Sequence, residues 1–222
     1  MKNILSLFAL FMLSQVAFAQ KAISEESDPR ATKFLDKMSS QFEGYSSYEL
    51  DFRVSMTTPD SEEPHVQNGK FIRKDAQYRV ISHDQNIFCD AQNVWIFTPK
   101  TNEVQINDAD DTGDDFVSPD KLFNLYKTGE YLYRVSREFK EKKSKMVEIE
   151  FKPTDRMSDF FKVKMVLNTT SNQPKSIKIF YKDGLRVTMT LSGLIKNKAY
   201  KKDFFSFDKS KHPGVKVEDL RL

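Results

Sequence analysis

The chain has 222 residues, enough for one medium-sized domain or two small ones, and its 39% hydrophobic and 30% charged residues are ordinary for a globular protein. Its 35 basic and 32 acidic residues leave a formal net charge of only +3. Because nucleic-acid-binding proteins need a strong excess of positive charge, we expect no nucleic-acid partner. The single cysteine, Cys89, excludes a disulfide within the chain.

The first nineteen residues have the pattern of a secretory signal. A basic start at Met1-Lys2 precedes an apolar run from Ile4 to Phe18, and small residues surround a cleavage site after Ala19. The run is about 15 residues long, shorter than the roughly 20 needed to span a bilayer. No cysteine stands at the cleavage site to receive a lipid. We therefore expect a signal peptide over residues 1–19 and a periplasmic, unanchored, monomeric domain over residues 20–222.

A helix is predicted near the start of the mature chain, beginning at Asp28-Pro29. Asp28 can cap it, Pro29 suits its first turn, and Gly44 marks its end. The apolar residues between them recur on one stripe: Ala31, Phe34, Leu35, Met38 and Phe42. The segment therefore predicts an amphipathic helix with one face against a core.

A long strand follows the helix. Apolar residues alternate with polar ones over residues 48–56, which predicts one apolar face and one solvent-facing side that includes Glu49. The apolar positions are Tyr48, Leu50, Phe52, Val54 and Met56.

Short strands and one further helix fill the rest of the chain. We expect strands at Val66 to Arg73, Gln77 to Ser82, Asn86 to Cys89, Asn93 to Thr98 and Glu103 to Asn107. A helix is expected from Ser118-Pro119 to Gly129. Later strands are expected at Tyr131 to Phe139, Lys145 to Phe151, Phe160 to Asn168, Lys175 to Tyr181, Leu185 to Gly193 and Val215 to Leu220.

These elements predict a mainly β, α+β fold. About eleven or twelve closely spaced strands, without a flexible linker, form one antiparallel sheet most economically. So large a sheet curls as its twist accumulates, and helices placed between strand blocks then lie in its concave face. Val94 to Phe97 is apolar at every position, which predicts that both faces of that strand are covered.

The sequence shows little sign of catalytic chemistry. His65, His83 and His212 lack the spacing of a metal pair, and Cys89 within a predicted strand is more simply a buried thiol than a nucleophile. The acidic stretch from Asp108 to Asp115 lacks the glutamate that completes a calcium loop. We therefore predict no metal, no cofactor and no enzyme activity. What stands out is 19 phenylalanines, three of them in the predicted signal peptide, which suit either a core or a lipid-binding surface.

Three segments, taken together, resemble successive motifs of one family. They are QNGKFIRKDAQYRV at 67–80, CDAQNVWIFTPKTNEV at 89–104 and FFSFDKSKHPGVKVEDLR at 204–221. Their order and spacing resemble those of the LolA-type outer-membrane lipoprotein carriers. This resemblance covers nearly the whole mature chain.

The resemblance implies an incomplete, strongly curled antiparallel β-barrel of about eleven strands, with helices forming a lid over an apolar cavity. It implies a periplasmic carrier that shields the acyl chains of triacylated lipoproteins. Such a carrier would receive them from an inner-membrane ABC-type release complex and deliver them to an outer-membrane acceptor. Two alternatives share these features: a carrier of another lipid and a lipid-binding stress sensor.

The implied cavity lining combines apolar residues of the strands with two from the second helix. It comprises Leu50, Phe52, Val54, Met56, Phe71, Tyr78, Val80, Ile87, Trp95, Phe97, Leu122 and Phe123. Family members carry an arginine that latches the lid, at a position where this sequence has Asp75. Arg73 and Arg79 are nearby, but a strand arginine is expected to face solvent. We therefore expect apolar contact to hold the lid.

Overall fold

The computed structural model describes residues 26–61, 63–109 and 123–221. These residues form one α-helix, α1 (Pro29–Glu43), three short 3-10 helices and a twelve-stranded sheet. The strands are β1 (Tyr48–Thr57), β2 (His65–Lys74), β3 (Gln77–Ser82), β4 (Asn86–Cys89), β5 (Asn93–Thr98), β6 (Glu103–Asp108), β7 (Tyr131–Glu141), β8 (Ser144–Pro153), β9 (Phe160–Asn168), β10 (Gln173–Tyr181), β11 (Arg186–Lys196) and β12 (Lys216–Asp219). The 3-10 helices are η1 (Leu125–Lys127), η2 (Lys202–Phe205) and η3 (Lys209–Lys211).

The sheet is built from two antiparallel runs joined at one seam. Its strand order is β12-β6-β5-β4-β3-β2-β1-β11-β10-β9-β8-β7, so β1 pairs with β2 on one side and with β11 on the other. Every pair is antiparallel except the pairing of β12 with β6. The mainly β fold predicted from the sequence is confirmed, and so is a single curled antiparallel sheet that stays open at both edges.

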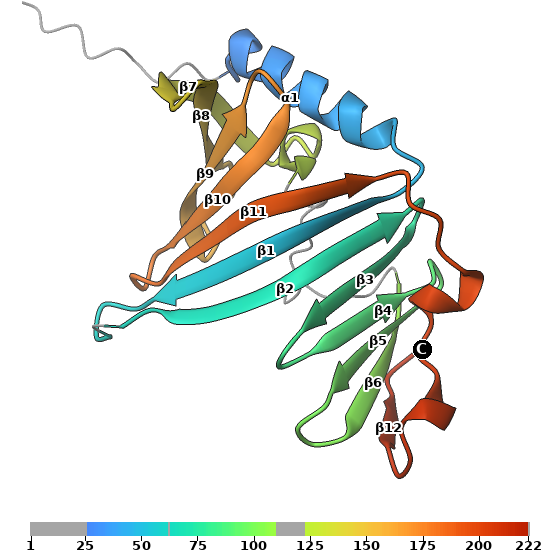
Figure 1. The fold of residues 1–222 in the computed structure, drawn as a ribbon. Helices are drawn as coiled ribbons and strands as arrows, with labels where there is room; N and C mark the ends of the chain where they lie inside the picture. Colours follow the sequence, from blue (N-terminus) through green and yellow to red (C-terminus); the bar gives the residue numbers. More distant parts are fainter. Residues whose placement is uncertain (1–25, 62, 110–122, 222) are drawn as a thin grey trace, which may run out of the picture.

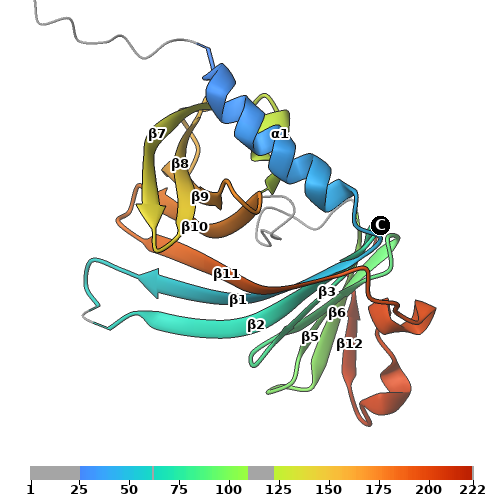
Figure 2. The same ribbon diagram turned by 45° about the horizontal axis from the view of Figure 1, so that its top comes forward.

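The sheet curls strongly, and α1 lies on its concave side (Figures 1 and 2). We call this side the inner face and the opposite side the outer face. The predicted start of α1 is confirmed: Asp28 Oδ1 accepts a 2.9 Å hydrogen bond from the backbone N–H of Arg30, and Pro29 occupies the first turn. Gly44 follows the last helical residue, as predicted.

The second predicted helix lies mostly outside the described residues. Of the expected span, 123–129 is described: Phe123 is helical, and Leu125–Lys127 form the single turn of η1. Ser118 to Leu122, with the predicted site residue Leu122, falls outside. The C-terminal 3-10 helices η2 and η3 were not predicted, because their lysine-rich sequences have no helical stripe. They lie against the outer face beside β3 to β6 (Figure 1).

Candidate functional site

The inner face carries a continuous apolar surface. Side chains alternate along a strand, and one cluster joins inner-face residues of nine strands to α1. Five predicted site residues are buried in this cluster: Leu50, Phe71, Val80, Ile87 and Phe123. Phe52 and Tyr78 are partly buried and pack against it. Val54 and Met56 face the same side as Phe52 and pair with Met189 and Val187 of β11. Most of the predicted set is therefore gathered on one face.

Helix α1 covers part of this face. Ala31, Leu35 and Met38 are completely buried, and Phe42 is almost so. These positions are the apolar stripe read from the sequence, which confirms the predicted orientation of the helix. Other inner-face residues, Phe52 among them, stay partly exposed. The cluster is therefore sealed under α1 and open beyond it.

Three aromatic side chains pack together at the C-terminal end of α1. The ring of Phe42 lies edge-on to Tyr48 at 5.0 Å and 5.2 Å from the ring of Phe123. Phe123 is 3% exposed, so the segment that follows the undescribed residues is anchored under the helix. Apolar contact between α1 and this segment agrees with the expected way of holding the lid.

Polar contacts that were not predicted from the sequence reinforce that anchor. The ammonium of Lys127 donates to Glu43 Oε1 at 2.6 Å and to Ser39 Oγ at 2.7 Å. The hydroxyl of Tyr126 donates to Asp36 at 2.9 Å. The hydrogen bond from Lys127 holds the pKa of Glu43 below its ordinary value, and burial raises the pKa of Tyr126 to about 12.

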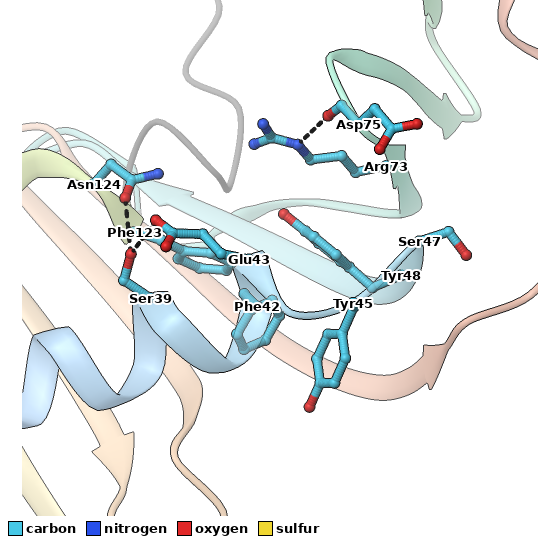
Figure 3. A pocket seen from close by; sticks show the side chains of 10 residues that line it. All are labelled: Ser39, Phe42, Glu43, Tyr45, Ser47, Tyr48, Arg73, Asp75, Phe123 and Asn124. Carbon is cyan, nitrogen blue, oxygen red and sulfur yellow. Dashed lines mark hydrogen bonds between the residues drawn. The ribbon is translucent and has the colours of Figure 1, made fainter.

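A pocket of about 270 Å³ opens beside this anchor, between α1 and the turn that joins β2 to β3 (Figure 3). It is lined by Ser39, Phe42, Glu43, Tyr45, Ser47, Tyr48, Arg73, Asp75, Phe123 and Asn124. Its lining is mixed, with aromatic rings on one side and charged groups at the rim. The pocket is therefore a mixed polar and aromatic cleft beside the helix end rather than part of the apolar interior.

The residue at the expected latch position has a backbone role. Asp75 is exposed and takes a left-handed conformation with φ of 53° in the turn between β2 and β3. Its backbone oxygen accepts a 2.8 Å hydrogen bond from Arg73 Nε. Arg73 therefore braces this turn at the rim of the pocket (Figure 3).

Trp95 and Phe97 do not face the interior, and the prediction that they line it is wrong. They belong to a second cluster, on the outer face, in which Phe97 packs 5.3 Å from the ring of Phe207. Val94 and Ile96 take the inner positions of the same strand. Both faces of β5 are thus covered, as its sequence predicts, but by the opposite assignment of residues.

A buried carboxylate on the outer face was also missed. Glu49 was expected in solvent but is 3% exposed, because the segment after β11 crosses over it. Lys198 donates to Glu49 at 2.6 Å, and the hydroxyl of Tyr200 and the ammonium of Lys70 also contact it. Burial acts to raise the pKa of Glu49, and these hydrogen bonds outweigh it and lower the pKa.

Among the described residues, no group of three or more histidine, cysteine or acidic side chains is arranged to hold a metal ion. None of the described helices has the length and apolar character needed to cross a membrane. The single cysteine, Cys89, is buried on the inner face, and burial raises the pKa of its thiol. A thiol in that state is a poor nucleophile.

Three similar solved structures are all distant from this chain in sequence. An uncharacterized conserved protein from Thermus thermophilus is 9% identical, with a TM-score of 0.58 and coverage of 86% of this chain and 99% of that one. Lipoprotein LppX of Mycobacterium tuberculosis is 8% identical, with a TM-score of 0.51 and coverage of 80% and 100%. A LolA superfamily protein of Nitrosomonas europaea is 14% identical, with a TM-score of 0.43 and coverage of 81% and 98%. The first two share the curled-sheet fold.

No curated protein matches the sequence. The family described as "Outer membrane lipoprotein carrier protein LolA" matches it over residues 43–208, which is most of the chain and includes the sheet from β1 to β11. The match takes in the strand residues of the inner-face cluster and the seam between β1 and β11, and the fold is the one the resemblance implied. The chain belongs to the LolA family of outer membrane lipoprotein carrier proteins.

Proposed function

We propose that this protein is a periplasmic carrier that binds the acyl chains of lipoproteins against its inner face. One observation supports this most directly: the apolar cluster under α1 continues beyond the helix as partly exposed side chains. Phe52, Val187 and Met189 all pack on the cluster and keep part of their surface open. An apolar surface of this kind marks a binding site.

The size of the acyl chains explains why such a carrier shields its cargo only in part. Three acyl chains carry roughly 45 methylenes, and exposing them to water costs on the order of 35 kcal/mol at about 0.8 kcal/mol each. Non-covalent affinity does not exceed about 20 kcal/mol. A carrier therefore shields such chains only in part, or opens its cover at a cost, and either arrangement also favours release.

The lid, which is α1 together with the segment from Phe123 to Lys127, is suited to opening. Lys127 and Glu43 both keep substantial exposure, and exposed ion pairs of this kind contribute only about 0–1 kcal/mol. The buried contact between Phe42 and Phe123 supplies most of the hold. Entering chains offer equivalent apolar contacts, so they can replace the Phe123 ring without a large net cost.

Membership of the family suggests the cargo and its route. In this proposal the protein accepts triacylated lipoproteins from an inner-membrane ABC-type release complex and passes them to an outer-membrane acceptor. Binding and release require no covalent chemistry, which is consistent with a carrier rather than an enzyme. The predicted signal peptide over residues 1–19 would place it in the periplasm.

Displacement of an environment-sensitive apolar dye tests the binding step. The dye should bind the purified mature chain with enhanced fluorescence. A triacylated peptide should displace it, whereas the same peptide without its acyl chains should not. Equal displacement by both peptides would contradict the proposal, and displacement by phospholipid alone would identify a carrier of free lipid instead.

A pair of neighbouring variants locates the site. Phe52→Glu places a carboxylate on the inner face, where an unpaired charge costs several kcal/mol. Arg53→Glu adds the same group next to it on the exposed outer face. The first variant should lose most dye binding and the second should keep it. Thermal melts must show that Phe52→Glu is folded, and normal dye binding by the folded variant would place the site elsewhere.

A further inference from the structure

Arg79 on β3 is held between two aromatic rings on the outer face. Its guanidinium carbon lies 4.4 Å from the centroid of Phe88 and 4.7 Å from that of Phe204 in η2. The sequence predicts an arginine facing solvent at this position. The C-terminal segment instead folds back and covers it, which corrects that expectation.

The Arg79 guanidinium has few hydrogen-bond partners and no ion-pair partner among the described residues, although it is partly buried. Of its five N–H donors, Nη1 donates a 3.3 Å hydrogen bond to the backbone oxygen of Phe204, while Nε is buried with no hydrogen-bond partner. No carboxylate within the described residues forms an ion pair with Arg79. Burial lowers its pKa, since the charged form has lost water without gaining a counter-ion. Native proteins rarely leave such a group unpaired, and water, an ion or a ligand commonly supplies the missing partner.

Arg79 lines a pocket of about 440 Å³ between the sheet and the C-terminal segment. Its lining is rich in cationic and aromatic groups: Arg79, Phe88, Lys198, Ala199, Tyr200, Lys201, Asp203, Phe204, Ser206, Asp208, Lys211 and His212. This pocket lies on the opposite side of the sheet from the proposed acyl-chain site, so the two sites share no lining residue.

The charges in the pocket do not cancel. Lys198 is paired with Glu49 at 2.6 Å, and Lys211 is paired with Asp208 at 3.1 Å. That leaves Arg79 and the exposed Lys201, neither of which forms an ion pair with a described residue. Asp203, also exposed, is the acidic group of the pocket that opposes them.

We infer that this outer-face pocket binds a phosphate monoester, with Arg79 and Lys201 contacting the phosphate group. The two Nη groups of a planar guanidinium present N–H donors side by side in a fork that matches phosphate oxygens, and a lysine adds a mobile charge. The rings of Phe88 and Phe204 hold the guanidinium in place, which lowers the entropic cost of binding. The phosphate can belong to a soluble ester or to the headgroup of a phosphatidic acid.

Isothermal titration calorimetry on the mature chain tests the inference, with sn-glycerol 3-phosphate and dihexanoylphosphatidic acid as probes. Saturable binding of glycerol phosphate is expected, and binding of both probes would show that a lipid headgroup also fits. Lys201→Glu should weaken binding by about tenfold or more without changing the melting temperature of the free protein. Lys202→Glu is the matched control, because Lys202 is next to Lys201 and exposed but does not line the pocket. This variant should bind glycerol phosphate nearly as the parent does.

Arg79→Met separates binding from packing. Methionine can keep an apolar contact between the two rings but carries no charge, so this variant should lose glycerol phosphate binding even where its melting temperature stays close to that of the parent. The inference is overturned if the parent chain binds neither probe at millimolar concentration. It is also overturned if the Lys201→Glu and Lys202→Glu variants bind glycerol phosphate equally well. A third contrary result is binding of the lipid alone with an affinity that Lys201→Glu does not change, because the lipid would then occupy the inner face.

Discussion

The ring of Phe52 lies over Gly69, its partner across the β1–β2 pair. A Cβ atom added to Gly69 would stand 2.3 Å from Phe52 Cζ and 2.5 Å from the backbone oxygen of Ile81. Real Cβ atoms do not approach other atoms so closely. The absence of a side chain at Gly69 therefore allows the Phe52 ring to lie along the inner face.

Gly69→Ala should lower the free energy of unfolding by about 1–3 kcal/mol, the usual cost of overpacking. The Phe52 ring can turn away, but the Ile81 carbonyl belongs to the sheet and cannot. The displaced ring would also reduce dye binding on the inner face. Urea unfolding and dye titration measure the two effects.

The double variant Gly69→Ala with Phe52→Leu provides the control. Removing the ring relieves one of the two clashes, so the losses should be less than additive. Strict additivity would mean that Phe52 does not rest on Gly69 in solution.

Phe123→Ala should loosen the packing of residues 123–129 against α1. Its ring is buried against Phe42, and truncation of a buried phenylalanine typically costs about 3–5 kcal/mol. Amide hydrogen exchange over residues 123–129 should accelerate while exchange in the central strands stays slow.

Asp75→Asn is the matched comparison at the rim of the same pocket. Asparagine tolerates the left-handed backbone of Asp75, so the substitution removes only the charge. Exchange over residues 123–129 should hardly change. Equal acceleration in the two variants would show that the Asp75 carboxylate does hold the cover.

The Glu49 network predicts a specific pH dependence of stability. Because the folded pKa of Glu49 lies below the ordinary 4.5, its contribution is fully present above about pH 4.5 and disappears as the pH falls through the folded pKa. Glu49→Gln should therefore lose about 1–3 kcal/mol at pH 7, and this loss should shrink steadily as the pH falls below about 4.5. Urea unfolding of both proteins across this range measures the difference. A difference that stays constant down to pH 3 would contradict the ionised network.

Cys89 offers a probe of opening on the inner face. Its thiol is 2% exposed, and burial raises its pKa, so both access and thiolate content are low. The folded protein should react with a thiol reagent at least about a hundredfold more slowly than the urea-unfolded chain, since only the opened fraction reacts. Reaction at comparable rates would show that β4 is not packed as described.

Local pattern was enough to predict most strands. The spans Gln77–Ser82, Asn86–Cys89, Asn93–Thr98 and Phe160–Asn168 match the structure residue for residue, because each is a short β-type run between turn formers. The stripe on α1 likewise identified its buried face. Features of this kind depend on neighbours within a few residues.

Which face each apolar residue occupies could not be predicted in the same way. At Trp95 and Phe97 every position of the strand is apolar, so alternation gives no direction, and the deciding contact comes from Phe207 in the distant tail. The burial of Glu49 depends on the same tail crossing the outer face. Single-sequence periodicity holds no information about such long-range packing.

The seam between β1 and β11 has a consequence for how the chain folds. Tyr48 pairs with Lys196, so the centre of the sheet is completed by residues from opposite ends of the sequence. Such distant pairing has a large loop-closure cost and gives slow folding. Until β11 is available, one edge of β1 has unpaired backbone groups, and these can pair with another chain. A truncation before β11 should therefore aggregate rather than fold as a smaller sheet.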